Sequence, residues 1–420
     1  MDIRPMRTLW LLSVAHAINH AQAVLLPLVF LAIIKEFGVS IATIAFLAAA
    51  GSFLSGTVQL SYSWLTRYAS RRNLLALGNL VFGGGMVAQA IAPGFGGFAV
   101  ANVVSKLGAS QQHPVGNGLI AEQFPPERRG MAISAHIAGG NVGTIAVPLI
   151  GAWLIAGLGW RWTVVLFGVP AILIGLAMYA LIRESGTDRA AALAAGNLRH
   201  AFANVLRDRD LRFIYLSSVL GGGGRGLGVL NLFVPAYLLL VIGIDEGTVA
   251  LMYTVLVAGS VPGPLVAGWL SDHVGRKPLI LVAYAGGAIS LVAFVLAGTS
   301  VPLLWLGIVG LSAFNFVGSP QLQALTADIA APAVRDAAFS VYFTLAFGVG
   351  SLWTALYGAV LDVRGEADGL PIVFLVMAVS FVAAAIAVVP VRAEERVAAQ
   401  RKADGADAPD PSADAAPGTA

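Results

Sequence analysis

The chain has 420 residues, of which 58% are hydrophobic and 11% charged, and its mean hydropathy is +0.82. Soluble domains carry about 25% charged residues, so this chain has too few to cover a water-exposed surface of its size. The composition therefore indicates a protein whose main solvent is the lipid bilayer. Cysteine is absent, which excludes disulfides, thiolate metal sites and cysteine nucleophiles. The net charge of +3 comes without a basic block, so nucleic-acid binding is not expected.

Charge-poor apolar runs that are long enough to cross a bilayer, which takes about 20 residues, follow one another along the chain. Turn sequences at 93–97 and 298–302 divide two of these runs. Lys106 and Arg225 each interrupt one helix without ending it. We predict twelve transmembrane helices, near residues 8–34, 41–64, 73–92, 97–122, 130–156, 162–182, 213–241, 247–271, 278–298, 301–327, 337–361 and 370–391.

The placement of Lys and Arg predicts the orientation. Alternate connections carry twenty of them on one side and three on the other. By the positive-inside rule, both termini and the connection 183–212 face the cytoplasm, in a multi-pass protein of the cytoplasmic membrane. That connection separates an N-terminal six-helix bundle, 1–182, from a C-terminal one, 213–391. We expect a disordered cytoplasmic tail over 392–420, which lacks apolar periodicity.

The two predicted bundles repeat each other at an offset near 205 residues. Residues 63–74 align with 268–279. At an offset of one residue more, Pro114 meets Pro320 and Arg129 meets Arg335. Two parallel six-helix repeats are the architecture of one class of transporter.

The segment 268–277 reads GWLSDHVGRK and resembles the loop motif between helices 2 and 3 of the major facilitator superfamily, GxLADRxGRR. The resemblance implies that residues 8–391 form that family's all-α fold of two pseudo-symmetric bundles. It also implies a cytoplasmic latch that favours the outward-open state, made by Asp272, Arg276 and Lys277. The first-half copy has Arg67 where the acid belongs, which argues against a latch there. An ordinary basic loop is the alternative for both copies.

The fifth predicted helix carries small residues that resemble the family's antiporter motif, gxxxGPxxGG, with Val147 replacing one glycine. Residues 105–151 also resemble the fosmidomycin-resistance group, through GASQQHP at 108–114 and GGNVG at 139–143. These resemblances imply export by exchange, whereas a generic packing face is the alternative. The helix-packing motif comprises Gly139, Gly140, Asn141, Gly143, Pro148 and Gly151.

Every Asp and Glu falls in a predicted loop, tail or helix end, so the membrane core has no expected carboxylate. Histidine, which titrates near neutral pH, is then the candidate proton carrier. His16 and His20 share a polar stripe with Asn19 on the first helix, and His113 lies on the fourth. Helices 1, 4, 7 and 10 line the cavity in the resembled family. Structural hydrogen bonding between helices is the alternative role.

Lys106 and Arg225 are predicted deep in helices 4 and 7, where a charge costs about 2.5–3.5 kcal/mol on insertion scales. Because no core carboxylate is available to pair with them, we expect an anionic solute to do so, with snorkelling as the alternative. The glycines around Arg225 would also allow the helix to unwind. The candidate substrate-binding residues are Lys106, Arg225, Asn19, Gln112, Asn315 and Gln321.

Signatures of enzymes and of metal sites are absent, so no enzyme activity, cofactor or metal is expected. The sequence predicts a monomeric secondary transporter that moves a small, anionic organic solute by alternating access and exports it in exchange for protons. The alternatives are an uptake symporter or facilitator of the same fold, and a non-transporting membrane sensor.

Overall fold

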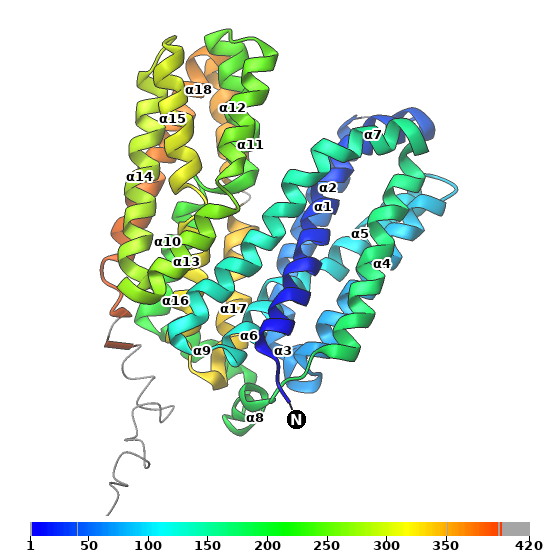
Figure 1. Cartoon of the computed structure of the whole chain (residues 1–420), viewed down its shortest axis with the longest axis vertical. Coiled ribbons are helices and arrows are strands. Elements are labelled where there is room, and N and C mark those ends of the chain that lie inside the picture. Colours follow the sequence, from blue (N-terminus) through cyan, green and yellow to red (C-terminus); the bar gives the residue numbers. More distant parts are fainter. Residues whose placement is uncertain (1, 40, 351, 394, 397–420) are drawn as a thin grey trace, which may run out of the picture.

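The structure is a computed structural model that describes residues 2–39, 41–350, 352–393 and 395–396. Within these residues every regular element is a helix. The helices form two bundles that meet at one end of the molecule and spread apart at the other (Figure 1). The N-terminus lies at the end where the bundles meet, which is also the end that holds α8 (Thr187–Ala194) and α9 (Leu198–Arg207). We call this the closed end.

The first bundle contains the elements up to α7. Its helices are α1 (Pro5–Phe37), α2 (Ile41–Val58) with η1 (Gln59–Ser61) and α3 (Tyr62–Tyr68), α4 (Arg71–Ile91), α5 (Phe95–Ala109) with η2 (Ser110–Gln112) and α6 (Pro114–Gln123), and α7 (Pro126–Leu181).

The second bundle contains the elements from α10 onward. They are α10 (Arg209–Gly221), α11 (Gly226–Ala236), η3 (Tyr237–Ile242), α12 (Glu246–Ala258), α13 (Pro262–Val274), α14 (Arg276–Leu296), α15 (Val301–Phe314), α16 (Gly318–Ile329), η4 (Pro332–Val334), α17 (Arg335–Phe343), η5 (Thr344–Val349) and α18 (Leu352–Val388).

The prediction of twelve transmembrane helices is confirmed, although some continuous helices of the structure span two predicted helices and some predicted helices are broken into shorter ones. α7 holds two predicted helices, which are joined at Gly159 (φ 76°). α18 holds the end of the eleventh predicted helix and most of the twelfth, which are joined at Gly365 (φ 72°). Glycine adopts this left-handed backbone without the steric cost of a Cβ, so the chain turns back at both points. Other predicted helices are interrupted, as α5–η2–α6 and α15–α16 are. The connection 183–212 is partly helical, because it contains α8 and α9 and the start of α10.

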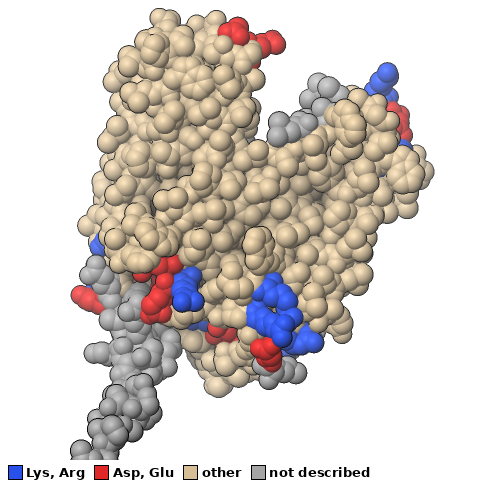
Figure 2. Space-filling view, viewed as in Figure 1, with Lys and Arg blue, Asp and Glu red and all other residues tan. Residues whose placement is uncertain are grey.

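The surface of the bundles is suited to lipid. Large apolar side chains such as Phe46, Trp153 and Leu296 are exposed on it. Six stretches of the described residues are long and apolar enough to cross a membrane by length and composition alone. Most of the visible Lys, Arg, Asp and Glu side chains gather toward the closed end, whereas the open end shows a hollow between the bundles (Figure 2).

The small residues of the fifth predicted helix bring α7 against α1. A Cβ at Gly139 would lie 2.7 Å from the Cβ of Ser13, and one at Gly143 would overlap the carbonyl oxygen of Ala17. Only hydrogen at these positions allows so close a backbone approach. The same contact places Gly140 against the ring of His16, where a Cβ would lie 2.8 Å from Nδ1.

Candidate functional site

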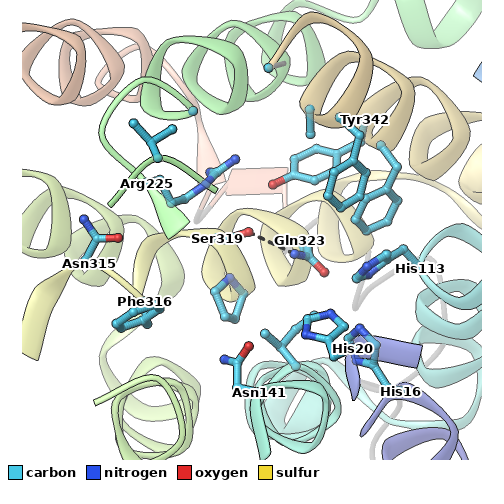
Figure 3. Close-up of a pocket in the computed structure, with 18 of the residues that line it drawn as sticks. His16, His20, His113, Asn141, Arg225, Asn315, Phe316, Ser319, Gln323 and Tyr342 are labelled. Carbon is cyan, nitrogen blue, oxygen red and sulfur yellow. Dashed lines mark hydrogen bonds between the residues drawn. The ribbon is translucent and has the colours of Figure 1, made fainter. Parts of the chain in front are cut away.

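A cavity of about 530 Å³ lies between the two bundles. Both halves of the chain line it, which a site for alternating access requires. Its polar and aromatic lining includes His16, His20, His113, Asn141, Arg225, Asn315, Ser319, Gln323, Tyr342 and Phe343 (Figure 3). Among the described residues, no Asp or Glu lines this cavity.

Four histidines of the first bundle gather at one side of the cavity. The ring of His16 lies 4.4 Å from that of His20, 4.7 Å from that of His113 and 4.3 Å from that of His136, between centroids. His113 also stacks at 5.1 Å on Phe343 of the second bundle. The three histidines predicted to carry protons therefore face one another. His136 of α7, which is not among the predicted proton carriers, joins the same cluster.

Arg225 stands where the seventh predicted helix breaks. α10 ends at Gly221, Arg225 is extended (φ −105°, ψ 141°), and α11 begins at Gly226. The expectation that Arg225 interrupts the helix without ending it is wrong, and the alternative of an unwound glycine segment describes what happens. Glycines leave the backbone free to depart from the helix, and neighbouring side chains then satisfy the released carbonyl groups.

Those carbonyls have partners from the second bundle. Tyr357 Oη donates to the Gly223 oxygen at 2.7 Å, and Asn315 Nδ2 donates to the Gly224 oxygen at 2.7 Å. Asn315, a predicted substrate ligand, therefore lines the cavity and also stabilises the non-helical segment between α10 and α11. Trp353 Nε1 donates to the Val219 oxygen at 2.8 Å.

The guanidinium of Arg225 is only partly engaged. Its Nη2 donates to the Ser218 carbonyl at 3.3 Å, whereas its buried Nη1 has no partner among the described residues. In Figure 3, Arg225 and the histidines lie on opposite sides of the cavity, and the Tyr342 hydroxyl points toward the arginine. That buried hydroxyl also has no partner within the described part of the chain.

Lys106 and Asn19 lie beside this cavity instead of in it. They line a second pocket of about 430 Å³, which shares Ser52, His113 and Phe347 with the first. The ammonium of Lys106 donates to the Ala48 carbonyl at 3.0 Å and reaches Ser52 Oγ at 3.4 Å. The expectation that Lys106 and Arg225 face one central cavity is therefore wrong, since Lys106 bends toward α2.

Two predicted substrate ligands make buried contacts between helices. Gln112 Nε2 donates to the Leu12 carbonyl at 2.9 Å, and Gln321 Nε2 donates to Ser134 Oγ at 3.1 Å. Neither lines the cavity, whereas Gln323 does. Gln323 lies two residues after Gln321 in sequence, and only the rotation of α16 distinguishes which of the two faces the cavity.

The packing motif divides between two partners. Gly139, Gly140 and Gly143 lie on α1, as described above. Asn141 faces the other bundle, where its Nδ2 donates to the Ser260 carbonyl at 2.6 Å. Gly151 is buried in α7, and the side chain of Pro148 lies outside the described part of the structure.

The closed end carries the contacts that the loop motif implied. The carboxylate of Asp272 accepts hydrogen bonds from the backbone N–H groups of Gly130 at 3.0 Å and Met131 at 2.9 Å, in the first bundle. Arg276 pairs with Asp272 and donates to the Pro126 carbonyl at 2.6 Å. Both residues therefore connect the two halves.

Lys277 does not belong to this latch. Its ammonium donates to the carbonyls of Val389, at 2.5 Å, and Val391, at 2.9 Å, within its own bundle. The ammonium thus binds the carbonyl end of α18, which is the negative end of the helix dipole.

The first-half copy of the motif also makes cross-bundle contacts, against the expectation from Arg67. Arg71 pairs with Glu122 of its own half and with Asp336 of the second half, at 2.8 Å. At the repeat offset of 206, Asp336 is the counterpart of Gly130. In the second-half motif the carboxylate, Asp272, belongs to the motif itself. In the first-half motif the carboxylate is Asp336, on the helix that the motif contacts.

A carboxylate of the central connection completes the closed end. Asp188 on α8 has a side chain that is 3% exposed, and it accepts from Arg335 Nη1 at 2.6 and 2.8 Å and from Arg71 Nη2 at 3.0 Å. It therefore joins an arginine of each bundle. No pattern in the sequence singles out this residue, because its partners lie more than a hundred positions away.

A fourth set of contacts lies at Asp328. It pairs with Arg129 of the first bundle at 3.2 Å and with Arg276 of its own at 3.1 Å. The repeat alignment marks Arg129 and Arg335 as equivalent. Arg129 pairs across the halves with Asp328, whereas Arg335 pairs with Asp188 of the central connection. Glu122 and Asp328, the deepest acids of the sequence, thus lie in ion pairs at the closed end.

Two helical bundles with a cavity between them, closed at one end by charged contacts, are an arrangement typical of membrane transporters. Comparison with known families agrees. The family model described as Major Facilitator Superfamily matches residues 12–354 and, in a second match, 214–415. The chain belongs to this superfamily. It is a multi-pass membrane protein and a secondary transporter of small metabolites, and it is not an enzyme.

Curated relatives are distant. A cis,cis-muconate transport protein of Acinetobacter baylyi is 25% identical, over 68% of this chain and 69% of its own length. A protein of Escherichia coli described as a probable L-galactonate transporter is 24% identical, over 62% of this chain and 60% of its own. A multidrug resistance protein B homolog of Mycobacterium tuberculosis is 24% identical over 43% of this chain and 34% of its own.

Solved structures share the fold. The proton:xylose symporter XylE has a TM-score of 0.74 at 15% identity, covering 91% of this chain and 94% of that one. The transporter FucP in its outward conformation also has a TM-score of 0.74 at 15% identity, covering 92% of this chain and 98% of that one. At this identity the likeness concerns the fold alone.

Proposed function

We propose that this transporter exports a small organic anion across the cytoplasmic membrane in exchange for protons. The observation that carries the anionic substrate is Arg225, a cation whose buried Nη1 has no hydrogen-bond partner among the described residues. It lies in a cavity whose described lining contains no carboxylate. A guanidinium binds carboxylates through paired, charge-assisted hydrogen bonds. The N-terminus of α11 at Gly226 adds the positive end of a helix dipole beside it.

The names of two relatives support this substrate class. Muconate and galactonate are both carboxylates, and the proteins named for them align with more than three-fifths of this chain. An anion in the cavity would also offset the cost of keeping Arg225 charged in a low-dielectric site. The cavity volume of about 530 Å³ suits a small metabolite.

A transport assay with purified protein in liposomes tests the anionic substrate. We expect uptake or counterflow of labelled muconate or galactonate, and competition by small carboxylates but not by neutral sugars. Arg225→Gln should weaken substrate binding by about 1.5–3 kcal/mol, the loss of a charged hydrogen-bond partner, and Arg225→Lys should retain part of it. Lys35→Gln, at an exposed lysine outside the cavity, is the control. Competition by neutral or cationic solutes alone would contradict the proposal.

The histidine cluster supports proton coupling. Apart from Arg225 and Tyr342, the titratable side chains in the described lining of the cavity are His16, His20 and His113. Replacing His16, His20 or His113 by Gln should flatten the pH dependence of transport for at least one of them. A pH-sensitive dye inside the liposomes reports the proton flux. Flux opposite to the substrate supports export by exchange, flux in the same direction supports an uptake symporter, and no flux supports a facilitator.

Export is supported by the small-residue motif of α7 and by the resemblance of 105–151 to the fosmidomycin-resistance group. We also propose that the closed end faces the cytoplasm, which makes the described conformation outward-facing. Because the chain has no cysteine, single cysteines map this directly. One at Ser185 should be protected from an impermeant maleimide in intact cells, and one at Gly247 should react. The reverse pattern would overturn the orientation.

We propose that the transporter acts as a monomer, because one chain supplies the complete cavity lining.

A further inference from the structure

The histidine cluster has a second property, which is the spacing of its nitrogens. One ring nitrogen each of His16, His20 and His113 lies within 4.8 Å of the other two. His16 and His20 are one turn apart on α1, and His113 stands between η2 and α6. Figure 3 shows the three rings together at the edge of the cavity.

Hydrogen bonds outside the cluster orient two of the rings. His16 Nδ1 lies 2.9 Å from the carbonyl oxygen of His136, which can only accept, so Nδ1 carries the proton and Nε2 keeps its lone pair. His20 Nδ1 lies 3.1 Å from Thr144 Oγ1. A ligating histidine in a metal site is held in the same way, by its other nitrogen.

The free nitrogens are buried without partners. His16 Nε2 and His113 Nδ1 are both buried and have no hydrogen-bond partner among the described residues. A buried imidazole nitrogen left without a partner loses hydration and gains nothing in return. Two further ring nitrogens of the cluster, both on His136, are in the same state. Those of His16 and His113 belong to the three rings whose nitrogens lie close together, and they point to a ligand that accepts lone pairs.

We propose that His16, His20 and His113 bind one divalent transition-metal ion of the Zn²⁺ type, with a fourth coordination position open to the cavity. Neutral imidazoles suit Zn²⁺, Co²⁺ and Ni²⁺, whereas Mg²⁺ and Ca²⁺ require oxygen ligands that the described cavity lining does not offer as carboxylates. Three protein ligands with an open position are typical of sites where the metal also contacts a substrate or water.

Modest side-chain movement completes the site. Tetrahedral ligands about 2.0–2.1 Å from zinc lie about 3.4 Å from one another. The nitrogens of the three rings, which lie up to 4.8 Å apart, therefore reach these separations when the rings rotate. Arg225 lies on the opposite side of the cavity from the three histidines, so a solute with two carboxylates would place one on the metal and the other on Arg225. This last point depends on the proposed function, whereas metal binding itself does not.

Protons compete with the metal, because each ligating nitrogen must be deprotonated. Metal binding should therefore weaken as the pH falls.

Cobalt titration of the full-length protein tests the proposal. The protein is purified in detergent without a polyhistidine tag, and Co²⁺ is added while the visible absorption of tetrahedral Co²⁺ is recorded. We expect saturable binding of one ion per chain, displaced by Zn²⁺. His16→Gln and His113→Gln should each weaken binding by about 100-fold or more, and Thr144→Val, which removes an orienting partner, by about 10-fold.

His273→Gln is the matched control, since His273 is exposed on α13 outside the cluster. It should bind Co²⁺ as the parent does. Melting curves without metal identify any variant that fails to fold, and the remaining ligand variants then decide the result. Absence of saturable binding in the parent, or unchanged binding in the folded ligand variants, would overturn the site.

The two proposals fail separately. Transport of labelled carboxylates without Co²⁺ binding would reject the metal site alone. Co²⁺ binding by a protein that neither binds nor transports carboxylates would reject the anionic substrate alone. Loss of transport in Arg225→Gln with Co²⁺ binding retained is the result expected if both are correct.

Discussion

Asp188 should control the equilibrium between the two states of the transporter. Its carboxylate holds Arg335 at 2.6 Å and Arg71 at 3.0 Å, and all three side chains are at most 5% exposed. Asp188→Asn keeps the shape but removes the charge. Arg71 retains Glu122 and Asp336, whereas Arg335 has no other ion-pair partner among the described residues.

Removing one partner of a buried ion pair costs about 3–5 kcal/mol, because the other charge stays buried without compensation. The loss acts on the described state only, since opening this end lets water reach Arg335. We take the lower figure, as Arg71 keeps two partners. About 3 kcal/mol corresponds to roughly a 100-fold rise in the ratio of the opposite-facing state to this one.

Accessibility measures this ratio. A single cysteine at Thr354, which lines the cavity, is introduced into the cysteine-free chain. An impermeant maleimide is then applied from the closed end, in vesicles of suitable orientation. Labelling should be faster in Asp188→Asn by up to about 100-fold, until the opposite-facing state dominates. Asp368→Asn, at an exposed acid, should change nothing.

Unchanged labelling in a folded Asp188→Asn protein would refute the reasoning, because the ion pair would then contribute nothing to closure. Arg335→Gln provides an independent check. It removes the other side of the same pair and should shift accessibility in the same direction.

Three further predictions concern the latch, the packing and the closed end. Asp272→Asn removes a charged acceptor from the Gly130 and Met131 amides. It should therefore destabilise the closed end by about 1.5–3 kcal/mol and lower kcat more than it changes KM. Unchanged kinetics and cysteine accessibility would mean that the motif sets only the orientation of the chain in the membrane. Gly143→Ala forces a Cβ onto the Ala17 carbonyl and should destabilise the protein by about 1–3 kcal/mol in thermal melts. Gly84→Ala, with open space around its Cβ, serves as its control, and equal melting temperatures for the two would contradict the close packing. Burial raises the pKa of Glu184 above its ordinary 4.5, so the folded state disfavours the charged carboxylate and loses stability as the pH rises from that value through the folded pKa. Glu184→Gln should therefore raise the melting temperature at neutral pH and leave it nearly unchanged in acid, whereas an equal shift at both would refute the assignment.

Sequence alone determined the membrane-spanning elements. A lipid-facing helix must be apolar over a length set by the bilayer, and this requirement is local, so each of the twelve helices could be located from composition and turn residues. The loop motif at 268–277 likewise identified Asp272 and Arg276, through its resemblance to the superfamily's loop motif and not through their contacts, which lie in the other bundle. Lys277 showed the limit of this reasoning, since its partners are carbonyls at the end of α18.

Tertiary structure alone decided which polar side chains meet. His113 and His16 are far apart in the chain, and their contact depends on the approach of α1 to α6 and α7. The rotation of α16 decides that Gln323 and not Gln321 lines the cavity. The direction of the side chain decides that Lys106 contacts α2. The position of α8 decides that Asp188 meets an arginine of each bundle. Such contacts depend on the packing of whole helices, whose rotation and depth are set by many small residues at once. The hydrophobic pattern specifies how many helices form and leaves open which faces they turn toward one another.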